Sequence, residues 1–471
     1  MKGNAGGSLP CPKFVIMTAN ARGDFMVEDI ANVTELIDRR KLGAFQKRVA
    51  FLCAIVAAME GFNIQSVGFI APALAQNFHL TPANLGLFFS LGLFGLLLGA
   101  IFVAPLADRF GRRPLLLACV PLLGLCSLLM AASSSVSVLD SLRFLSGLAI
   151  GGALPNTIAL TSEYSPHRRR SLLVGLMFTG FILGSIAAGL SATRLLPAFG
   201  WQAIFILGGV MPLVLAPLLY VALPESVRFL VLHRASPERI AILLQRLDPT
   251  LQIGRHTRFI TGETASSGTS VLALFREGRA KRTLLLWIIS FMSLFNIYLL
   301  ANWLPTEMRA LGFPIETAIL VGTVLQFGGL TGTIFAWLAD RIGANVALAA
   351  AYFVGAICVS CIALVGHNQT LVMLAVLGTG FGILGGQTVA NALAAISYPT
   401  EIRSTGVGWA TGFGRIGSIL GPGLAGVLLQ LDISAQNIFL LAVIPALIAS
   451  AAAAGMGRVQ TSFAVGKEAT I

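Results

Sequence analysis

Long runs of apolar residues, separated by short polar stretches, dominate this chain. Twelve runs are close to the roughly 20 residues that a helix needs to cross the ~30 Å hydrocarbon core of a bilayer. They lie at 48–72, 84–107, 113–133, 138–162, 170–193, 202–223, 282–304, 317–340, 344–366, 370–396, 403–427 and 436–457. The pattern predicts twelve transmembrane helices.

A charged turn appears twice, nearly half the chain length apart. The first copy runs from Ala104 to Arg113 (APLADRFGRR) and the second from Ala336 to Gly343 (AWLADRIG). A duplicated set of membrane helices is typical of secondary transporters. We predict an all-α integral membrane protein with two pseudo-symmetric six-helix bundles. Its parts are an N-terminal tail at 1–47, a first bundle at 48–223, a central loop at 224–281, a second bundle at 282–457 and a C-terminal tail at 458–471.

Composition supports this class and supplies an orientation. Hydrophobic residues make up 56% of the chain and charged residues 11%, which excludes a soluble globule. If the N-terminus is cytoplasmic, nearly all of the 32 Lys and Arg fall on the cytoplasmic side, and only Arg194 and Arg309 face outward. This asymmetry follows the positive-inside rule. It predicts a multi-pass protein of the cytoplasmic (inner) membrane with both termini inside, whose positive charge meets anionic lipid rather than nucleic acid.

Several kinds of chemistry have no support in the sequence. The five histidines are scattered, so no metal site is predicted. Most of the six cysteines lie inside apolar runs, which argues against a disulfide framework. There is no phosphate-binding glycine loop with a following lysine, and no nucleophile, base and orienting group at a recognisable spacing. We therefore expect no cofactor and no enzyme activity.

Three ionisable residues lie well inside the predicted spans, away from their first and last residues. Glu60 is the acid nearest the middle of a span, and Arg143 and Arg415 are the intramembrane bases. Such groups cost several kcal/mol unless they are paired or face a water-filled cavity, so they are functional candidates. Glu60 lies ~18 Å along its helix from the inner end and Arg143 ~7 Å from the outer end, so the two can meet. We predict that they couple transport to protons; a purely structural ion pair is the alternative. Arg415 binds a substrate carboxylate or anchors its helix.

The pattern of particular residues resembles a known family. The stretch from Arg143 to Gly151 looks like the fourth-helix motif of the major facilitator superfamily, and Pro224–Arg228 resembles the end of its sixth helix. More specific stretches are similar to the aromatic acid:proton symporter family, nearest to its hydroxyphenylpropionate branch. They are Val33–Asp38, Met59–Asn63, Gly68–Pro72, Tyr398–Trp409 and Gly414–Pro422. The family usually has Asp-Gly-x-Asp in the first helix, where this chain has Glu60 and Asn63.

The resemblance implies a central cavity lined by helices 1, 4, 7 and 10. Polar candidates for substrate binding there, with Arg415, are Asn63, Gln65, Asn156, Asn296, Tyr298, Asn302, Gln387 and Asn391. Aromatic walls are expected from Phe62, Phe291, Phe295 and Trp303. The duplicated turns would gate the cycle by latching the two halves together. Their candidate residues are Asp108, Arg109, Gly111, Arg112, Asp340, Arg341 and Arg403.

These features together predict a secondary transporter that imports an aromatic carboxylate with a proton by alternating access. The substrate is a hydroxyphenylpropionate, benzoate or hydroxybenzoate, and the transporter works as a monomer in the bilayer. Two alternatives stay open. One is a transporter of another organic anion, such as a dicarboxylate, or an exporter of amphipathic compounds. The other is a membrane sensor that binds aromatic acids without moving them.

Overall fold

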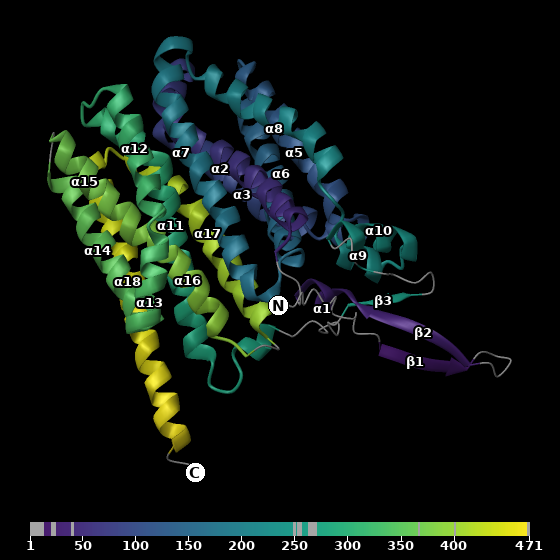
Figure 1. The fold of residues 1–471 in the computed structure, drawn as a ribbon. Coiled ribbons are helices and arrows are strands. Elements are labelled where there is room, and N and C mark those ends of the chain that lie inside the picture. Colours follow the sequence, from purple (N-terminus) through teal and green to yellow (C-terminus); the bar gives the residue numbers. More distant parts are fainter. Residues whose placement is uncertain are drawn as a thin grey trace, which may run out of the picture.

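Long helices make up most of the computed structural model, which describes residues 14–19, 25–38, 42–247, 251, 257–261, 271–365, 368–399 and 402–468 (Figure 1). The elements before residue 224 are β1 (Phe14–Ala19), β2 (Phe25–Asn32), α1 (Val33–Asp38), α2 (Ala44–Phe78), α3 (Pro82–Leu98), the π turn η1 (Gly99–Val103), α4 (Leu106–Phe110), α5 (Arg112–Ala131), α6 (Val136–Glu163), the 3-10 turn η2 (His167–Arg169), α7 (Arg170–Phe199) and α8 (Gln202–Ala222). Those after it are α9 (Val227–Leu232), α10 (Pro237–Leu247), β3 (Arg258–Ile260), the 3-10 turn η3 (Val271–Leu274), α11 (Ala280–Ala310), α12 (Ile315–Gly329), α13 (Gly332–Ile342), α14 (Ala344–Leu364), α15 (Gln369–Thr379), the π turn η4 (Gly380–Leu384), α16 (Gly385–Ile396), α17 (Arg403–Gln430) and α18 (Ala435–Glu468).

The twelve-helix architecture is confirmed. Eleven helical segments of the described chain are long and apolar enough to cross a membrane. The remaining predicted span, 317–340, is divided, because α12 ends at Gly329 and α13 begins at Gly332. We call α2–α8 the N half and α11–α18 the C half. Helices such as α2 exceed their apolar runs, since polar flanking residues can continue a helix into water.

Glycines form the duplicated turns. Gly111 and Gly343 have φ angles of 103° and 91°, a conformation that residues with a Cβ rarely adopt. In each copy a new helix starts at the next residue, α5 at Arg112 and α14 at Ala344. The same backbone reversal thus occurs in both halves. We call the end of the bundle that carries these turns the turn side, and the opposite end the far side.

Each half also contains a close helix crossing at paired glycines. In the N half, a Cβ on Gly151 of α6 would lie 2.9 Å from the Cα of Gly99. In the C half, a Cβ on Gly380 would lie 3.0 Å from the Cα of Gly328. The two π turns, η1 and η4, begin at Gly99 and Gly380. Glycine lets the helix backbones touch at these points, as is common in membrane bundles.

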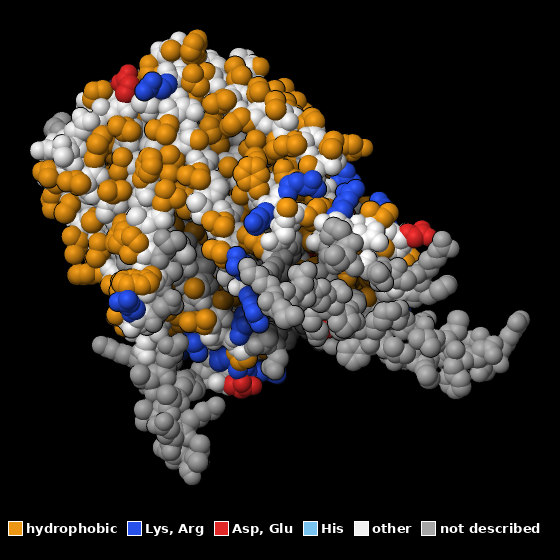
Figure 2. Space-filling view, in the orientation of Figure 1, with side chains coloured by type: hydrophobic (Ala, Val, Ile, Leu, Met, Phe, Trp, Pro, Cys, Tyr) orange, Lys and Arg blue, Asp and Glu red, His pale blue; other side chains and the backbone are white. Residues whose placement is uncertain are grey.

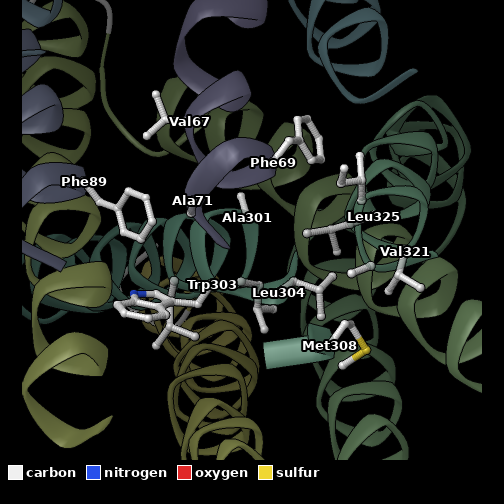
Figure 3. Packing of buried hydrophobic residues seen from close by; sticks show 14 of the residues in the cluster. Val67, Phe69, Ala71, Phe89, Ala301, Trp303, Leu304, Met308, Val321 and Leu325 are labelled. Atoms are coloured by element: carbon white, nitrogen blue, oxygen red, sulfur yellow. The ribbon is translucent and has the colours of Figure 1, made fainter. Parts of the chain in front are cut away.

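The two halves contact each other near the far side. A Cβ on Gly68 of α2 would lie 2.5 Å from the carbonyl O of Ala301 in α11. Ser90 of α3 donates its hydroxyl hydrogen to the carbonyl O of Ile419 in α17, at 2.8 Å. Buried apolar residues of both halves fill the region between these contacts (Figure 3). They include Val67, Phe69, Ala71 and Phe89 of the N half and Ala301, Trp303, Leu304, Met308, Val321 and Leu325 of the C half.

Toward the turn side the helices of the two halves diverge, and both chain ends lie there (Figure 1). Lys and Arg side chains gather at this end, whereas hydrophobic side chains cover the flanks of the helices (Figure 2). A belt of exposed apolar side chains is the surface that a bilayer covers. The contacts between the halves described above thus lie near the far side, and the helices separate toward the turn side (Figure 1).

A small sheet joins the N-terminal segment to the central loop. Strand β1 pairs antiparallel with β2, and β2 pairs parallel with β3. After β2, the side chain of Asn32 caps α1, and Asp38 at the end of α1 accepts a hydrogen bond from the backbone N–H of His167, at 2.7 Å. Strands β1 and β2 fall within residues 1–47, which the sequence predicts to be a tail. Short strands at its edge carry too weak an alternation to stand out beside the long apolar runs.

Candidate functional site

Glu60 lies inside the N half and is 1% exposed. The neighbouring Gly61 packs directly against α7, where a Cβ would lie 2.1 Å from the carbonyl O of Phe181, and Glu60 itself lies in electrostatic range of the thiols of Cys53 and Cys119. Neither carboxyl oxygen has a hydrogen-bond partner. An ionised carboxylate without a donor costs several kcal/mol in such surroundings, so the arrangement suits a protonated carboxyl group.

Arg143 of α6 is 4% exposed and is bound to the same helix as Glu60. Its Nη1 and Nη2 donate to the carbonyl oxygens of Asn63 and Ile64, at 3.3 and 3.4 Å, while Nε has no partner. Gly92 of α3 makes room for the guanidinium, because a Cβ there would lie 2.5 Å from Nε. The structure therefore does not join Arg143 to Glu60. It places the guanidinium about one turn farther along α2.

Two arginines and a tyrosine converge between the halves. Tyr298 of α11 is 7% exposed, and its hydroxyl accepts a long hydrogen bond from Nη1 of Arg415 in α17, at 3.4 Å. Arg143 of the N half also lies within electrostatic range of Tyr298. Asn302, one turn farther along α11, donates to the backbone carbonyl of Tyr298 at 2.7 Å. The phenol thus has the guanidinium of Arg415 at hydrogen-bond distance and that of Arg143 within electrostatic range, a suitable environment for an anion.

Aromatic rings of α11 and α17 pack against one another toward the turn side. Phe291 stacks on Phe295, with ring centroids 6.2 Å apart, and Phe413 stacks on Trp287 at 4.9 Å. Two other expected wall residues lie elsewhere. Phe62 is buried in the packing of the N half, and Trp303 donates to the carbonyl O of Pro422 near the far side. The aromatic surface next to Arg415 therefore comes from α11 and α17.

Several predicted polar ligands have their hydrogen bonds inside one half. Asn63 donates to Met59 and Gly208, Asn156 to Ala104 and Gly152, and Asn296 to Ala442. Gln65 is 5% exposed, and its Oε1 has no partner. In contrast, Gln387 is half-buried and Asn391 is exposed, and the two are hydrogen-bonded to each other at 2.9 Å. The structure therefore brings Arg143 and Arg415 toward Tyr298, whereas the amide of Asn302 is bonded to the backbone of its own helix, and Gln387 and Asn391 lie on the neighbouring α16.

The first duplicated turn is held by Glu163 of α6 and by Glu225, which lies between α8 and α9. Asp108 is largely exposed and pairs with Arg112 at 3.2 Å, and Arg112 also pairs with Glu163 at 3.3 Å. Glu225 accepts hydrogen bonds from the backbone N–H groups of Arg112 and Arg113, at 2.9 and 3.2 Å. Sequence reasoning missed Glu163 and Glu225 as members of this network, although Glu225 was part of a motif. A role in gating stays a prediction for these residues.

The other gating candidates are placed as follows. The guanidinium of Arg109 lies over the ring of Phe110 at 5.3 Å and that of Arg341 over Trp337 at 4.0 Å. Arg403 donates to the carbonyl O of Tyr398 at 3.4 Å. The side chain of Asp340 lies outside the described residues, so the two turns cannot be compared at this position.

Tyr164 follows the end of α6 and secures the same network. Its hydroxyl donates to the carbonyl O of Glu225 at 2.5 Å. Burial, helped by the nearby carboxylates of Glu163 and Glu225, raises the pKa of the phenol well above its ordinary value. The hydroxyl therefore remains a donor at any physiological pH. A small cavity beside Tyr164, lined by Asp38, Glu163 and Arg228 among others, is separate from the site around Tyr298.

A second buried acid lies in the C half. Glu307 of α11 is 1% exposed, and its Oε2 has no hydrogen-bond partner. Glu307 lies three residues beyond the predicted end of this span at 304. In the structure α11 continues to Ala310. Among the described residues no three His, Cys, Asp or Glu side chains cluster as metal ligands would.

Comparison with known proteins identifies the class. The model of the Major Facilitator Superfamily matches residues 52–422 and, again, 286–460. The chain belongs to the Major Facilitator Superfamily. It is thus a membrane transporter and not an enzyme, as the sequence predicted. A crystal structure of a bacterial homologue of the human lysosomal transporter Spinster, inward-facing and unoccupied, shares the fold of this transporter, with a TM-score of 0.65, 16% identity, and coverage of 89% of this chain and 98% of the other.

Relatives of this transporter confirm the resemblance to the aromatic acid branch. It is 39% identical to the 4-hydroxybenzoate transporter PcaK of Pseudomonas aeruginosa over 423 residues, 89% of this chain and 94% of PcaK. The gallate transporter of Pseudomonas putida is 39% identical over 438 residues, 92% and 97% of the two chains. The 3-(3-hydroxy-phenyl)propionate transporter of Escherichia coli is 37% identical over 386 residues, 81% and 86% of the two chains.

Proposed function

We propose that this transporter imports an aromatic carboxylate together with a proton, by alternating access. The observation that carries the proposal is the convergence of Arg143 from the N half and Arg415 from the C half on Tyr298, beside a wall of aromatic rings. A carboxylate between the two guanidinium groups would replace the weak 3.4 Å bond to the phenol with charge-assisted ones. Its ring would lie against the α11 and α17 aromatics. The names of the relatives support the same substrate class.

A proton is needed because the substrate is an anion. Moving one negative charge against an inside-negative potential costs ~2.3 kcal/mol per 100 mV, and one co-transported proton removes this term. Glu60 is the proposed carrier, since it is buried in the N half without a donor to stabilise its charged form. Arg143 bound to the carbonyls of α2, and not to Glu60, is the arrangement expected while Glu60 holds the proton.

The turn side is proposed to be cytoplasmic, because Lys and Arg gather there. The conformation is then inward-facing, with both termini inside the cell and the protein in the inner membrane as a monomer. Substrate and proton leave into the opening between the halves. In the outward-facing state the turn at Asp108 and Arg112 would approach the first turn of α17, near Arg403, and hold the turn side shut.

The test uses purified protein in liposomes with an acidic exterior. With one pH unit across the membrane, wild-type protein should accumulate labelled 4-hydroxybenzoate about tenfold, and a protonophore should abolish the gradient. Glu60→Gln should lose this accumulation but keep exchange of substrate at equal pH. Glu307→Gln is the matched control, because it removes an equally buried carboxyl group from the other half. It should accumulate like the wild type.

Other results would point to the alternatives. A dicarboxylate that competes better than aromatic acids would assign another organic anion as substrate. Accumulation that survives Glu60→Gln would move proton coupling to another group. Binding of aromatic acids without uptake would indicate a sensor.

A further inference from the structure

The N-terminal helix α1 is packed onto the turn side of the N half. The side chains of Val33, Leu36 and Ile37 are at most 9% exposed and belong to one apolar cluster with Val227 and Leu230 of α9. Figure 1 shows α1 below the N half, at the same end as the duplicated turns. Three buried apolar side chains on a six-residue helix indicate a docked segment rather than a free tail.

The docked helix ends in a charge that meets the start of α7. Oδ1 of Asp38 accepts a hydrogen bond from the backbone N–H of His167 at 2.7 Å and lies 3.8 Å from Nη2 of Arg170, the first residue of α7. The carboxylate thus holds both the beginning of η2 and the guanidinium that follows it. The side chains of Asp38 and Arg170 are about one-third exposed, so their ion pair is weak and can be exchanged for another.

The start of α7 has a counterpart in the C half. Residues Arg170–Gly175 read RSLLVG, and residues Arg403–Gly408 read RSTGVG. In each half this sequence begins a long helix, α7 in the first and α17 in the second. The chain therefore repeats both parts of the proposed closure of the turn side. These parts are the turn with its acid and the helix start with its arginine.

The repeat relates the second turn to Arg170. The proposed outward-facing state brings the first turn, with Asp108, to the start of α17 near Arg403. The same relation in the other copy brings the second turn, with Asp340, to the start of α7 near Arg170. In this structure Asp38 already lies there. A second carboxylate that approaches this arginine is repelled by the first, so Asp38 opposes the approach of the second turn.

We propose that α1 is autoinhibitory: Asp38 occupies the position on α7 that Asp340 takes when the turn side closes, and it thereby favours the inward-facing state. This inference rests on the proposed function, because it uses the same two states, and it adds a regulatory contact to them. The contact acts on the equilibrium between the states and takes no part in binding the substrate or the proton. Loss of the charge of Asp38 shifts this equilibrium toward the outward-facing state.

The experiment measures how fast a membrane-impermeant thiol reagent labels Ser90→Cys from outside intact cells, without substrate. Ser90 lies in the contact between the halves near the far side, so it becomes accessible when that side opens. Asp38→Asn keeps an oxygen for the N–H of His167 but removes the charge. It should speed labelling about two- to fivefold, the effect of one partly exposed ion pair. Asp340→Asn should slow labelling by a similar factor, and adding Asp38→Asn to it should then change little.

Two variants serve as controls, and protein without Ser90→Cys corrects for the native cysteines. Asp38→Glu keeps the charge and should label at the parent rate. Glu238→Gln removes an exposed acid of α10, on the same side of the membrane, and should also keep that rate. Unchanged or slower labelling in Asp38→Asn would overturn the autoinhibitory role, and so would an equal acceleration when Asp340 is also replaced. Absence of aromatic acid uptake would instead reject the proposed substrate, because labelling needs none.

Discussion

Asn63 of α2 has its amide fully engaged inside the N half. Nδ2 donates to the carbonyl oxygens of Met59 and Gly208, at 3.0 and 3.1 Å, and Oδ1 accepts from the hydroxyl of Ser127 at 2.6 Å. The related family usually has aspartate at this position. A carboxylate has no hydrogens to donate, so it would face two carbonyl oxygens here. The surroundings therefore select the amide, and they leave Glu60 as the acid of this helix segment.

Asn63→Asp should destabilise the protein by about 2–5 kcal/mol, because two buried acceptors lose their donor and a charge is buried among them. The change should appear as a lower midpoint of thermal unfolding in detergent. Ser127→Ala is the control, since it removes one neutral hydrogen bond from the same group and should cost about 1 kcal/mol. A midpoint for Asn63→Asp equal to that of the wild type would contradict a structural role for the amide.

The sequence marks the candidate residues more clearly than it marks their contacts. Glu60, Arg143 and Arg415 stood out because an ionisable residue in an apolar run is costly to bury unless it has a partner or a function. The sequence could not predict the contacts of Arg143 with the carbonyls of α2, because every residue has a backbone acceptor, whatever its side chain. The sequence also could not distinguish the buried Asn63 and Asn156 from the exposed Asn391. That distinction depends on how each helix is rotated in the bundle.

The paired glycines place helix backbones in direct contact. A Cβ on Gly151 would lie 2.1 Å from the carbonyl O of Leu96, and a Cβ on Gly380 would lie 2.2 Å from that of Leu325. In both cases the obstructing atom belongs to the backbone and cannot rotate away. The neighbouring π turns η1 and η4 show that the helices already deviate from regular geometry there. These crossings have little tolerance for added volume.

Gly151→Ala and Gly380→Ala should therefore each destabilise the transporter by about 1–3 kcal/mol, because the helices must separate to accept a methyl group. The measurement is the fraction of monodisperse protein that survives heating, by size-exclusion chromatography. Gly175→Ala is matched in chemistry but has open space around it, with no atom within 4 Å of the added Cβ. It should survive like the wild type. If all three variants behave alike, the crossings are not tightly packed.

The number and order of the helices followed from the apolar runs and the repeated turn. The apolar runs did not predict the break between α12 and α13, and they did not predict the two π turns. Their glycines are equally compatible with straight, closely packed helices, and the choice between bending and packing depends on what lies across the crossing. The small sheet of β1, β2 and β3 escaped notice for a related reason, since its third strand comes from a distant part of the chain.

The contacts between the halves near the far side must separate if the transporter alternates. Ser90 of α3 and Gly423 of α17 are neighbours across this contact, and a Cβ on Gly423 would lie 3.9 Å from the Cβ of Ser90. This distance is within the range of disulfide bonds. The pair can therefore test whether the closed far side belongs to a transport cycle.

In the double variant Ser90→Cys and Gly423→Cys, oxidation should form a disulfide and stop uptake almost completely, because the far side can no longer open. A reductant should restore transport. The two single variants, treated with the same oxidant, control for the native cysteines and should remain active. Full uptake with a cross-link demonstrated by mass spectrometry would show that these helices need not part.

The two guanidinium groups beside Tyr298 also bear on leakage. Arg143 and Arg415 belong to different halves and carry the same sign of charge, so they repel each other whenever nothing negative lies between them. A transporter that holds a proton but no anion must overcome that repulsion when its halves move together around this point, whereas one that holds an anion does not, and a fully empty one has the charge of ionised Glu60 to offset it. We expect the state with a proton and no anion to change conformation slowly. Protons would then seldom cross without cargo, and the cell would not dissipate its gradient through an idle protein.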